Sequence, residues 1–422
     1  MNSVTAYHAP QYPGQPGMAE RYRAVRRQSE VLAAPLTPED MAVQTMPNVS
    51  PTKWHLAHVS WFFETFLLGR QPDYRVFDER FHYLFNSYYQ TAGTMHPRPQ
   101  RGLLSRPDVQ RILEYRAHVD EHMEEAIHRY GEDPEFAGLV VLGLHHEQQH
   151  QELMLTDIKH VFSCNPLEPA YQNGPREQNP QAPPLRFHSG PEGIREIGFS
   201  GSGFGFDNET PRHTVLLHPH AIANRLVTCG EFRDFIRDGG YRRPELWLSD
   251  GWSTVQAESW NRPSYWGEDL ESIFSLDGRR ELDPNEPVTH VSFYEADAFA
   301  SWAGYRLPSE AEWEVAAAEQ TPRGNFADSG HLHPFGVSDG GPLSQIFGDC
   351  WEWTRSAYAP YPGYQPPAGT IGEYNGKFMC NQMVLRGGSC VTPPGHIRAT
   401  YRNFFYPPDR WQFTGIRLAR DE

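Results

Sequence analysis

A stretch rich in proline, asparagine and glutamine, from Cys164 to Gly190, divides the chain into two parts with different residue patterns. It contains few apolar residues, which is typical of a linker between domains. The chain has 422 residues, more than one ordinary hydrophobic core accommodates, so two or three domains are expected. We predict an N-terminal domain over residues 18–163, a linker over 164–190 and a C-terminal domain over 191–422.

The N-terminal part is predicted to be an all-α four-helix bundle. Two helix-start signals, Thr37-Pro38 and Ser50-Pro51, each place a hydroxyl at the N-cap and a proline at the first helical position. Residues 54–68 and 136–162 are apolar on nearly every side, as expected for helices buried inside a bundle. A helix over residues 107–130 is amphipathic and would cover them.

The C-terminal part consists of short aromatic and β-branched runs interrupted by glycine and proline. Helical patterns occur over Tyr294–Trp302 and Ser309–Ala318, and strands do not alternate with helices as they do in a parallel α/β sheet. The fold class is therefore multi-domain, with an all-α bundle followed by an α+β domain.

Charge and composition exclude several classes of function. The formal net charge is −16 and no run of Lys and Arg is present, which argues against a nucleic-acid partner or an anionic membrane surface. No segment is apolar enough to cross a membrane, and Met1 to Gly17 lacks the apolar core of a secretion signal. The five cysteines never occur as C-x-x-C, so neither a disulfide framework nor a cysteine zinc site is indicated. We expect a cytoplasmic protein with small-molecule substrates.

A candidate metal site lies in the predicted helix over 136–162. His146 and His150 are four residues apart, so their imidazoles lie one turn apart on one helix face and are able to share a metal ion. His58, in the other buried helix, is the best candidate for a third ligand. The alternative is a set of structural histidines, each with its own buried partner.

Other histidines fit less well. The pair His118 and His122 has the same spacing but falls opposite the apolar face of its helix, so we expect it to be solvated. His55 and His145 neighbour the candidate ligands but are turned away from them by the helical twist of ~100° per residue, and we leave them out.

The residues His146-Glu147-Gln148-Gln149-His150 also match the H-E-x-x-H pattern of zinc proteases, with Glu147 as general base. No longer protease signature accompanies the pattern. Three neutral imidazoles leave positions open on an octahedral ion, which favours ferrous iron that gathers substrates and dioxygen. Zinc stays an alternative.

Longer motifs in both parts resemble a known family. SPTKWHLAHVSWFFETFLL (50–68), FNSYY (85–89) and HHEQQHQELML (145–155) resemble the DinB-like iron domain of the sulfoxide synthases of ergothioneine biosynthesis, the EgtB family. The C-terminal part is similar to the formylglycine-generating-enzyme fold, a C-type-lectin-like α+β domain. Its landmarks are PVTHVSFYEADAFASWAGYRLPSEAEWE (287–314), GDCWEWT (348–354), LRGGS (385–389) and GIRLA (415–419).

The resemblance implies an O2-dependent reaction that joins a thiol sulfur to C2 of the imidazole of hercynine, Nα-trimethylhistidine, as a sulfoxide. It implies Fe(II) bound by His58, His146 and His150. It also places Gln149 near the hercynine carboxylate and Asn403 and Phe404 over the same substrate, at the domain interface.

Departures from the family pattern suggest the sulfur donor. Members that use γ-glutamylcysteine carry an aspartate where this chain has Phe405, and the adjacent Tyr88 and Tyr89 resemble the cysteine-using branch, in which such a tyrosine donates the proton. We therefore favour free cysteine. Arg98 and Arg101 are candidate partners for its carboxylate, because guanidinium forms strong paired bonds to carboxylates.

Several alternatives stay open at this stage. A selenoneine synthase or an ovothiol-type synthase that joins histidine and cysteine would share much of this sequence, and a non-catalytic zinc-binding protein of the same two domains belongs to a different class. A structural Ca²⁺ in the C-terminal domain and a homo-oligomer are also left open. A second cysteine shortly after Gly387-Gly388-Ser389, which copper-dependent formylglycine generation requires, is missing.

Overall fold

The computed structural model describes residues 17–173, 178–338 and 341–422, which form two compact units. Unit 1 contains the described residues up to Pro166 together with Gly201–Asp207 and Gln365–Lys377, and unit 2 contains the rest. Two short segments of the C-terminal half therefore pack with the N-terminal helices. The described residues do not include most of Met1–Gly17, the stretch interpreted as lacking a secretion signal. They also do not include residues 174–177 of the predicted linker. The exact domain bounds stay a prediction.

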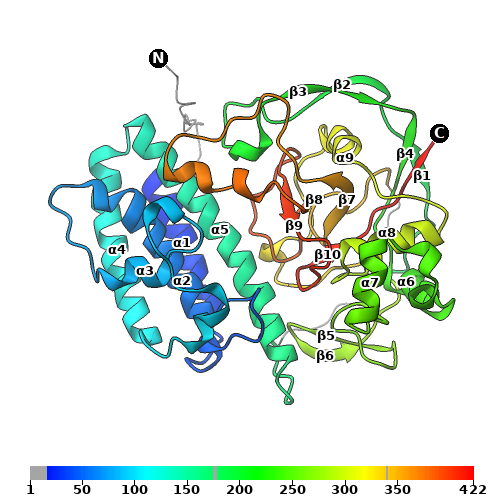
Figure 1. The fold of residues 1–422 in the computed structure, drawn as a ribbon, viewed down its shortest axis with the longest axis horizontal. Coiled ribbons are helices and arrows are strands. Elements are labelled where there is room, and N and C mark those ends of the chain that lie inside the picture. The colour runs from blue at the N-terminus through cyan, green and yellow to red at the C-terminus, as the bar shows by residue number, and fades with distance from the viewer. Residues whose placement is uncertain (1–16, 174–177, 339–340) are drawn as a thin grey trace. The chain divides into compact units, whose positions relative to one another are not determined.

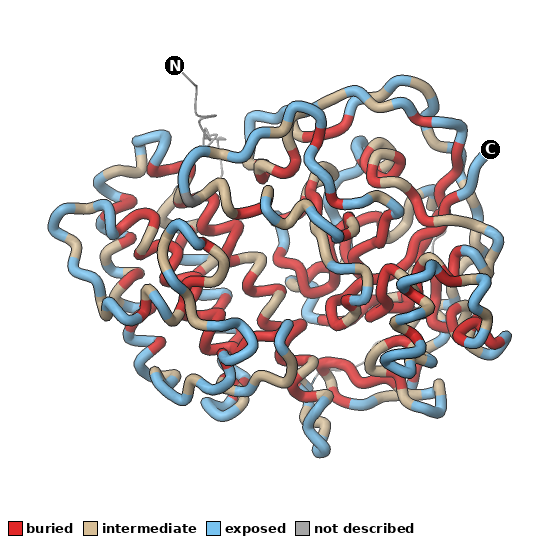
Figure 2. Tube along the Cα trace, viewed as in Figure 1, coloured by how far each residue is buried: buried red, intermediate tan, exposed pale blue. Residues whose placement is uncertain are grey.

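Unit 1 is built on four long helices, which confirms the predicted bundle (Figure 1). They are α1 (Met18–Ala33), α2 (Thr52–Phe66), α4 (Val109–Tyr130) and α5 (Pro134–Ser163). Helix α2 packs against α4 and α5, and α1 packs against α5. Nearly all of α2 and most of α5 are buried, whereas α4 buries one face, as its pattern predicted (Figure 2). The shorter elements of the unit are α3 (Arg80–Phe85) and the 3-10 turns at Asp40–Ala42, Leu68–Arg70, Gln90–Ala92, Arg98–Leu103, Thr370–Glu373 and Gly376–Phe378, the last of which ends in unit 2.

Both predicted helix starts need correction. Thr37 accepts a hydrogen bond from the Asp40 amide, but only a 3-10 turn follows, because Pro47 and Pro51 leave too short a run for a helix. The first bundle helix is α1 instead, whose many charged residues hide its weak apolar face. Ser50 does not cap α2, because Pro51 is the N-cap and the Ser50 hydroxyl accepts a hydrogen bond from Arg101 at 2.9 Å. The Ser50 amide donates to the Asp157 carboxylate at 2.8 Å.

Unit 2 is an α+β domain, as predicted. Its helices are α6 (Cys229–Arg237), α7 (Ser249–Ala257), α8 (Phe293–Trp302) and α9 (Glu310–Ala317). The patterns over 294–302 and 309–318 are confirmed as α8 and α9, and each helix begins with a capping box, Ser292 with Glu295 and Ser309 with Glu312.

The strands of unit 2 are short and form four small sheets. The orders are β1-β4-β11, β10-β7-β8-β9, β2-β3 and β5-β6. All pairs are antiparallel except β10 with β7. The bounds are β1 (Phe187–Ser189), β2 (Gly193–Ile197), β3 (His213–Leu217), β4 (His220–Ala223), β5 (Ser272–Ser275), β6 (Gly278–Glu281), β7 (Trp351–Ala357), β8 (Met383–Arg386), β9 (Asn403–Phe405), β10 (Thr414–Gly415) and β11 (Ala419–Asp421).

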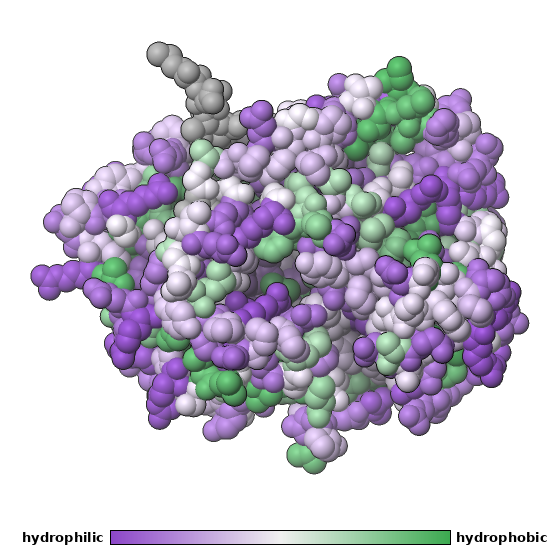
Figure 3. Space-filling model, in the orientation of Figure 1, coloured by the Kyte–Doolittle hydropathy of each residue, from purple (hydrophilic) through white to green (hydrophobic). Residues whose placement is uncertain are grey.

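The four-stranded sheet is part of the buried core of unit 2. Trp351 and Trp353 of β7 are buried, and the fully buried Glu352 between them forms an ion pair with Arg417 at 2.8 Å. By contrast, the β2–β3 ribbon exposes Ile194 and Leu216, which are directly paired. Figure 3 shows an apolar patch on the part of the surface where this ribbon lies. Across the described chain, each helix falls short of the length or apolar character needed to span a bilayer.

Candidate metal centre

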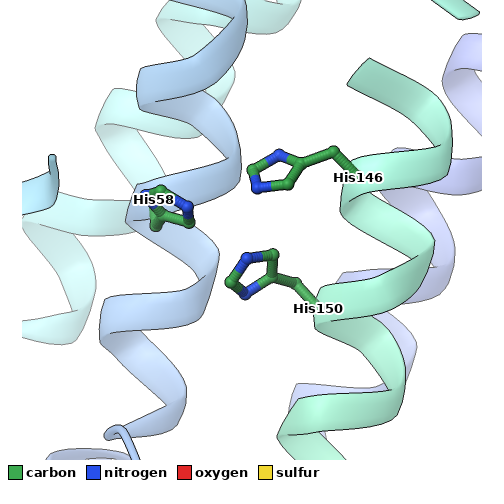
Figure 4. A group of neighbouring side chains, drawn as sticks. All are labelled: His58, His146 and His150. Atoms are coloured by element: carbon green, nitrogen blue, oxygen red, sulfur yellow. The ribbon is translucent and has the colours of Figure 1, made fainter. Parts of the chain in front are cut away.

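The structure brings His58, His146 and His150 together inside unit 1. His58 extends from α2 and the other two from successive turns of α5, and the three imidazoles point toward one another (Figure 4). One ring nitrogen of each lies within 4.8 Å of the others, and all three residues are buried. Among the described residues this is the cluster of potential ligands with a geometry that a single metal ion could join.

The hydrogen bonds of these rings leave nitrogen lone pairs without a partner. His58 Nδ1 donates to the Phe85 carbonyl at 2.6 Å, and its Nε2 has no partner among the described residues. Neither ring nitrogen of His146 has one in the described part of the chain. Buried polar atoms without partners cost free energy, so a bound cation would satisfy this site better than the protein alone does.

Burial also sets the protonation state of the cluster. It lowers the pKa of His146 to about 3, and burial together with the neighbouring imidazoles lowers the pKa of His58 and His150 well below the usual range. The rings are therefore neutral at physiological pH, which is the form that binds a metal. A neutral set of three nitrogen donors suits Fe, Zn, Cu or Ni and leaves further coordination positions for other molecules.

Glu147 does not serve this centre. Its carboxylate is fully buried on another face of α5 and forms ion pairs with Arg26 at 2.9 Å and Arg116 at 3.1 Å. It also accepts a hydrogen bond from Ser29 at 2.6 Å. A carboxylate with both oxygens engaged by α1 and α4 is not free to take a proton from a metal-bound water, so the zinc-protease interpretation is wrong.

Three of the other histidines differ from expectation. His55, which the helical twist seemed to turn away, has its Nδ1 2.8 Å from His150 Nδ1. The ring therefore does not point away from the candidate ligands, although the cluster of potential ligands does not include it. Its position three residues before His58 was the available signal. His118 and His122 are half-buried rather than fully solvated, because both rings contact Tyr74. His145 stacks on Phe204 of the 201–207 segment with ring centroids 4.0 Å apart.

Tyr88 and Tyr89 are joined to the histidines through one aromatic ring each. Trp61 contacts both His58, with centroids 5.6 Å apart, and Tyr89, at 5.7 Å. Tyr374 contacts both His146, at 5.8 Å, and Tyr88, at 6.3 Å. Burial raises the pKa of both Tyr88 and Tyr89, so both phenols stay protonated at neutral pH.

The segment 365–377 contributes residues that sequence analysis missed. Tyr374 donates a hydrogen bond to the Gln149 side chain. Glu373 accepts hydrogen bonds from the amides of Gln90 at 3.0 Å and Thr91 at 2.9 Å, directly after the two tyrosines. Lys377 pairs with Glu373 at 2.8 Å. The segment therefore fixes the tyrosine loop, and no local signal in 365–377 pointed to this role.

The two candidate arginines lie in different environments. Arg98 is exposed and donates to the Asn48 carbonyl. Arg101 is buried, lies over the Trp54 ring at 3.3 Å, and directs its two hydrogen bonds to the hydroxyls of Ser50 and Ser87. Its Nε has no partner within the described chain. A buried guanidinium whose hydrogen bonds, within the described residues, go to hydroxyls and not to a carboxylate is well suited to an anionic ligand.

The remaining candidates lie on β9 in unit 2. Phe404 stacks on Tyr358 with centroids 4.0 Å apart, and its amide donates to Asn403 Oδ1 at 2.9 Å. Phe405 contacts Trp411. Their role at the substrate stays a prediction.

Comparison with known proteins agrees with this two-part architecture. Residues 21–154 match the DinB superfamily, and residues 176–340 and 335–422 match the sulfatase-modifying factor enzyme 1-like domain. The formylglycine-generating enzyme of Streptomyces coelicolor is 32% identical over 278 residues, which cover 52% of this chain and 84% of that protein.

Two relatives match across both parts. The hercynine oxygenase of Mycobacterium tuberculosis is 30% identical over 408 residues, covering 90% of this chain and 93% of the relative. That of Mycolicibacterium smegmatis is 31% identical over 412 residues, covering 90% and 92%. Since these matches include the helical part with its three clustered histidines, the chain belongs to the hercynine oxygenase family.

Proposed function

We propose that this protein joins the sulfur of cysteine to C2 of the hercynine imidazole, using dioxygen and Fe(II) bound by His58, His146 and His150. The observation that carries the proposal is the buried cluster of three neutral imidazoles in a chain that matches hercynine oxygenases over nearly its full length. Bound Fe(II) would supply open positions where both substrates and dioxygen meet, which turns a three-body encounter into a reaction within one assembly.

The reaction balances without a further reductant. The C2–H bond of hercynine and the S–H bond of cysteine are broken, and a C–S bond and a sulfoxide S–O bond form. One oxygen atom of O2 ends in the sulfoxide and the other leaves as water. The two substrates supply the electrons, so the protein has to provide binding, exclusion of solvent and a proton at the right atom.

The tyrosine pair is the proposed proton source. Because burial keeps both phenols protonated, Tyr88 or Tyr89 can donate its hydroxyl proton to the oxygen that becomes water. Without that donor, oxidation of the thiol to a sulfinate should compete. Replacing each tyrosine with phenylalanine should shift the product ratio toward the sulfinate in one variant, and an unchanged ratio in both would remove the tyrosines from the reaction.

Substrate binding is assigned to residues of both units. Gln149, adjacent to the ligand His150 and held by Tyr374, is proposed to contact the hercynine carboxylate. Asn403 and Phe404 are proposed to close over the same substrate. Arg101 is the preferred partner of the cysteine carboxylate, with Arg98 as the exposed second candidate. Phe405 offers no anion for the ammonium group of a γ-glutamyl donor, which favours free cysteine.

One experiment tests the function and its alternatives. The full chain is loaded with Fe(II) without oxygen and then incubated in air with hercynine or histidine and with cysteine, γ-glutamylcysteine or a selenosugar. The expected product, identified by mass spectrometry, is the hercynine–cysteine sulfoxide. A histidine adduct would support the ovothiol-type alternative, and a selenium adduct the selenoneine synthase.

A zinc-binding protein without turnover would behave differently. It would bind zinc tightly and consume no oxygen in the presence of both substrates, and that result would overturn the proposed function. A cytoplasmic location, a homo-oligomer and a structural Ca²⁺ in the C-terminal domain stay predictions.

A further inference from the structure

A second layer of polar residues lies behind His150. His150 Nδ1 lies 2.8 Å from His55 Nδ1, and His55 Nε2 lies 3.0 Å from Asp157 Oδ2. The same Asp157 oxygen accepts the Ser50 amide at 2.8 Å. His55 is 2% exposed and Asp157 3% exposed, so water does not compete for these hydrogen bonds.

The Ser50 amide determines which atom donates and which accepts in each of these hydrogen bonds. The Ser50 amide can only donate, so Asp157 Oδ2 accepts there, and an ionised carboxylate also accepts from His55 Nε2–H. A neutral His55 that carries its proton on Nε2 has an acceptor at Nδ1. The Nδ1 of His150 must then carry a proton and donate it, which leaves the His150 Nε2 lone pair for a metal ion.

The other two histidines are oriented differently. The Phe85 carbonyl accepts from His58 Nδ1 directly, so the proton position there needs no relay. His146 has no orienting hydrogen bond among the described residues. The three imidazoles are therefore held by three different arrangements, and His150 is the one whose orientation depends on a buried carboxylate.

We propose that His55 and Asp157 are positioning residues that fix the tautomer and orientation of His150 and increase its basicity as a metal ligand. This inference rests on the proposed metal centre, and it assigns a role to two residues outside the ligand set. Outer partners of metal-bound histidines commonly change metal affinity by roughly 10–100-fold. We expect an effect of that order here because both relay residues are buried.

A purely structural role for Asp157 makes a different prediction. Its carboxylate also lies beside the start of α2, where it stabilises the helix by accepting the Ser50 amide. If that were its whole role, substitutions would lower the unfolding temperature and leave the metal affinity of the folded protein unchanged. Metal affinity and stability therefore have to be measured separately.

The test uses the full chain and titration with Co(II), whose visible absorption reports ligand geometry. The variants are His55→Phe and Asp157→Asn, each alone and combined. The matched control is His160→Phe, which also replaces a histidine with phenylalanine. His160 lies on α5 with His150 and Asp157, and its imidazole bonds Thr45 at 2.7 Å and not a candidate ligand. Circular dichroism and unfolding temperature establish that each variant is folded at the assay temperature.

We expect His55→Phe to weaken Co(II) binding by roughly 10–100-fold, and His160→Phe to leave it unchanged. Asp157→Asn should weaken binding in the same direction. The double variant should lose little more than His55→Phe, because the carboxylate acts through His55. Proton NMR of the Co(II) protein should also lose one shifted, exchangeable imidazole N–H signal in His55→Phe.

The outcomes separate this inference from the proposed function. Absence of metal binding by the unmodified protein would refute the metal centre itself. Normal binding by the unmodified protein, with the same affinity and N–H signals in folded His55→Phe or Asp157→Asn, would overturn only the relay. If His55→Phe does not fold, the near-isosteric Asp157→Asn decides the question by the same titration.

Discussion

Replacing Glu147 with glutamine distinguishes a structural carboxylate from a catalytic one. The substitution keeps the shape of the side chain but removes the charge that pairs with two buried guanidinium groups, Arg26 and Arg116. Arg26 would retain its ion pair with Asp120 at 2.6 Å. Arg116 would retain the half-exposed Glu30 at 3.6 Å and hydrogen bonds to two backbone carbonyls, which carry no full charge. Removal of one partner from a buried ion pair costs about 3–5 kcal/mol. For a unit of this size, each kcal/mol lowers the midpoint by about 2–4 °C, so the expected decrease is roughly 6–20 °C.

The assay compares thermal unfolding with Co(II) affinity measured well below the midpoint. Glu147→Gln should lower the midpoint and leave metal affinity of the folded protein unchanged, because the carboxylate faces α1 and α4. The control Glu135→Gln makes the same change on the same helix in an exposed pair with Arg70, and should shift the midpoint by no more than roughly 4 °C. A midpoint for Glu147→Gln within that same margin, accompanied by loss of sulfoxide formation, would refute the structural assignment and restore Glu147 as a catalytic base.

Three further predictions concern the site. Adding Co(II) at about 100 times its Kd should stabilise the protein by about 2.7 kcal/mol, and His146→Ala should abolish that shift in a melting curve; an equal shift in the variant would place the metal elsewhere. Arg101→Met should raise the KM for cysteine by roughly 10–100-fold, because a charged hydrogen bond is lost, with little change in the KM for hercynine. Steady-state kinetics in which both KM values rose together would contradict this assignment. Partial burial raises the pKa of Glu373, but hydrogen bonds from Lys377 and Thr91 outweigh this effect and lower the pKa to about 2. Because the folded pKa lies below the usual value of about 4.3, the contribution of this contact to stability is complete above that value and is lost as pH falls toward 2. Hydrogen exchange of the Thr91 amide, corrected for its intrinsic pH dependence, should become faster over this pH range. Glu373→Gln should abolish this pH dependence.

Local spacing predicted the fold well where the signal lay within a few residues. The helical patterns over 294–302 and 309–318 located α8 and α9, whose capping boxes are each completed by residues within three positions of the cap. Reasoning from hydroxyl–proline pairs failed at Thr37 and Ser50. There the hydroxyl motif was present, but nearby prolines and the distant carboxylate of Asp157 decided which backbone groups were paired.

Sequence by itself determined that His146 and His150 share one face of a buried helix, since the rise and twist of an α-helix are the same wherever it forms. It also indicated the two-part architecture and, through long motifs, the family. Only the tertiary structure decided what lies across from that face. The rotation of α2 against α5 brings His58 to the pair and His55 behind it, and turns Glu147 toward Arg26 and Arg116. Tyr374 reaches the same centre from more than two hundred residues along the chain. Such contacts depend on how whole elements pack, and no spacing within one element contains that information.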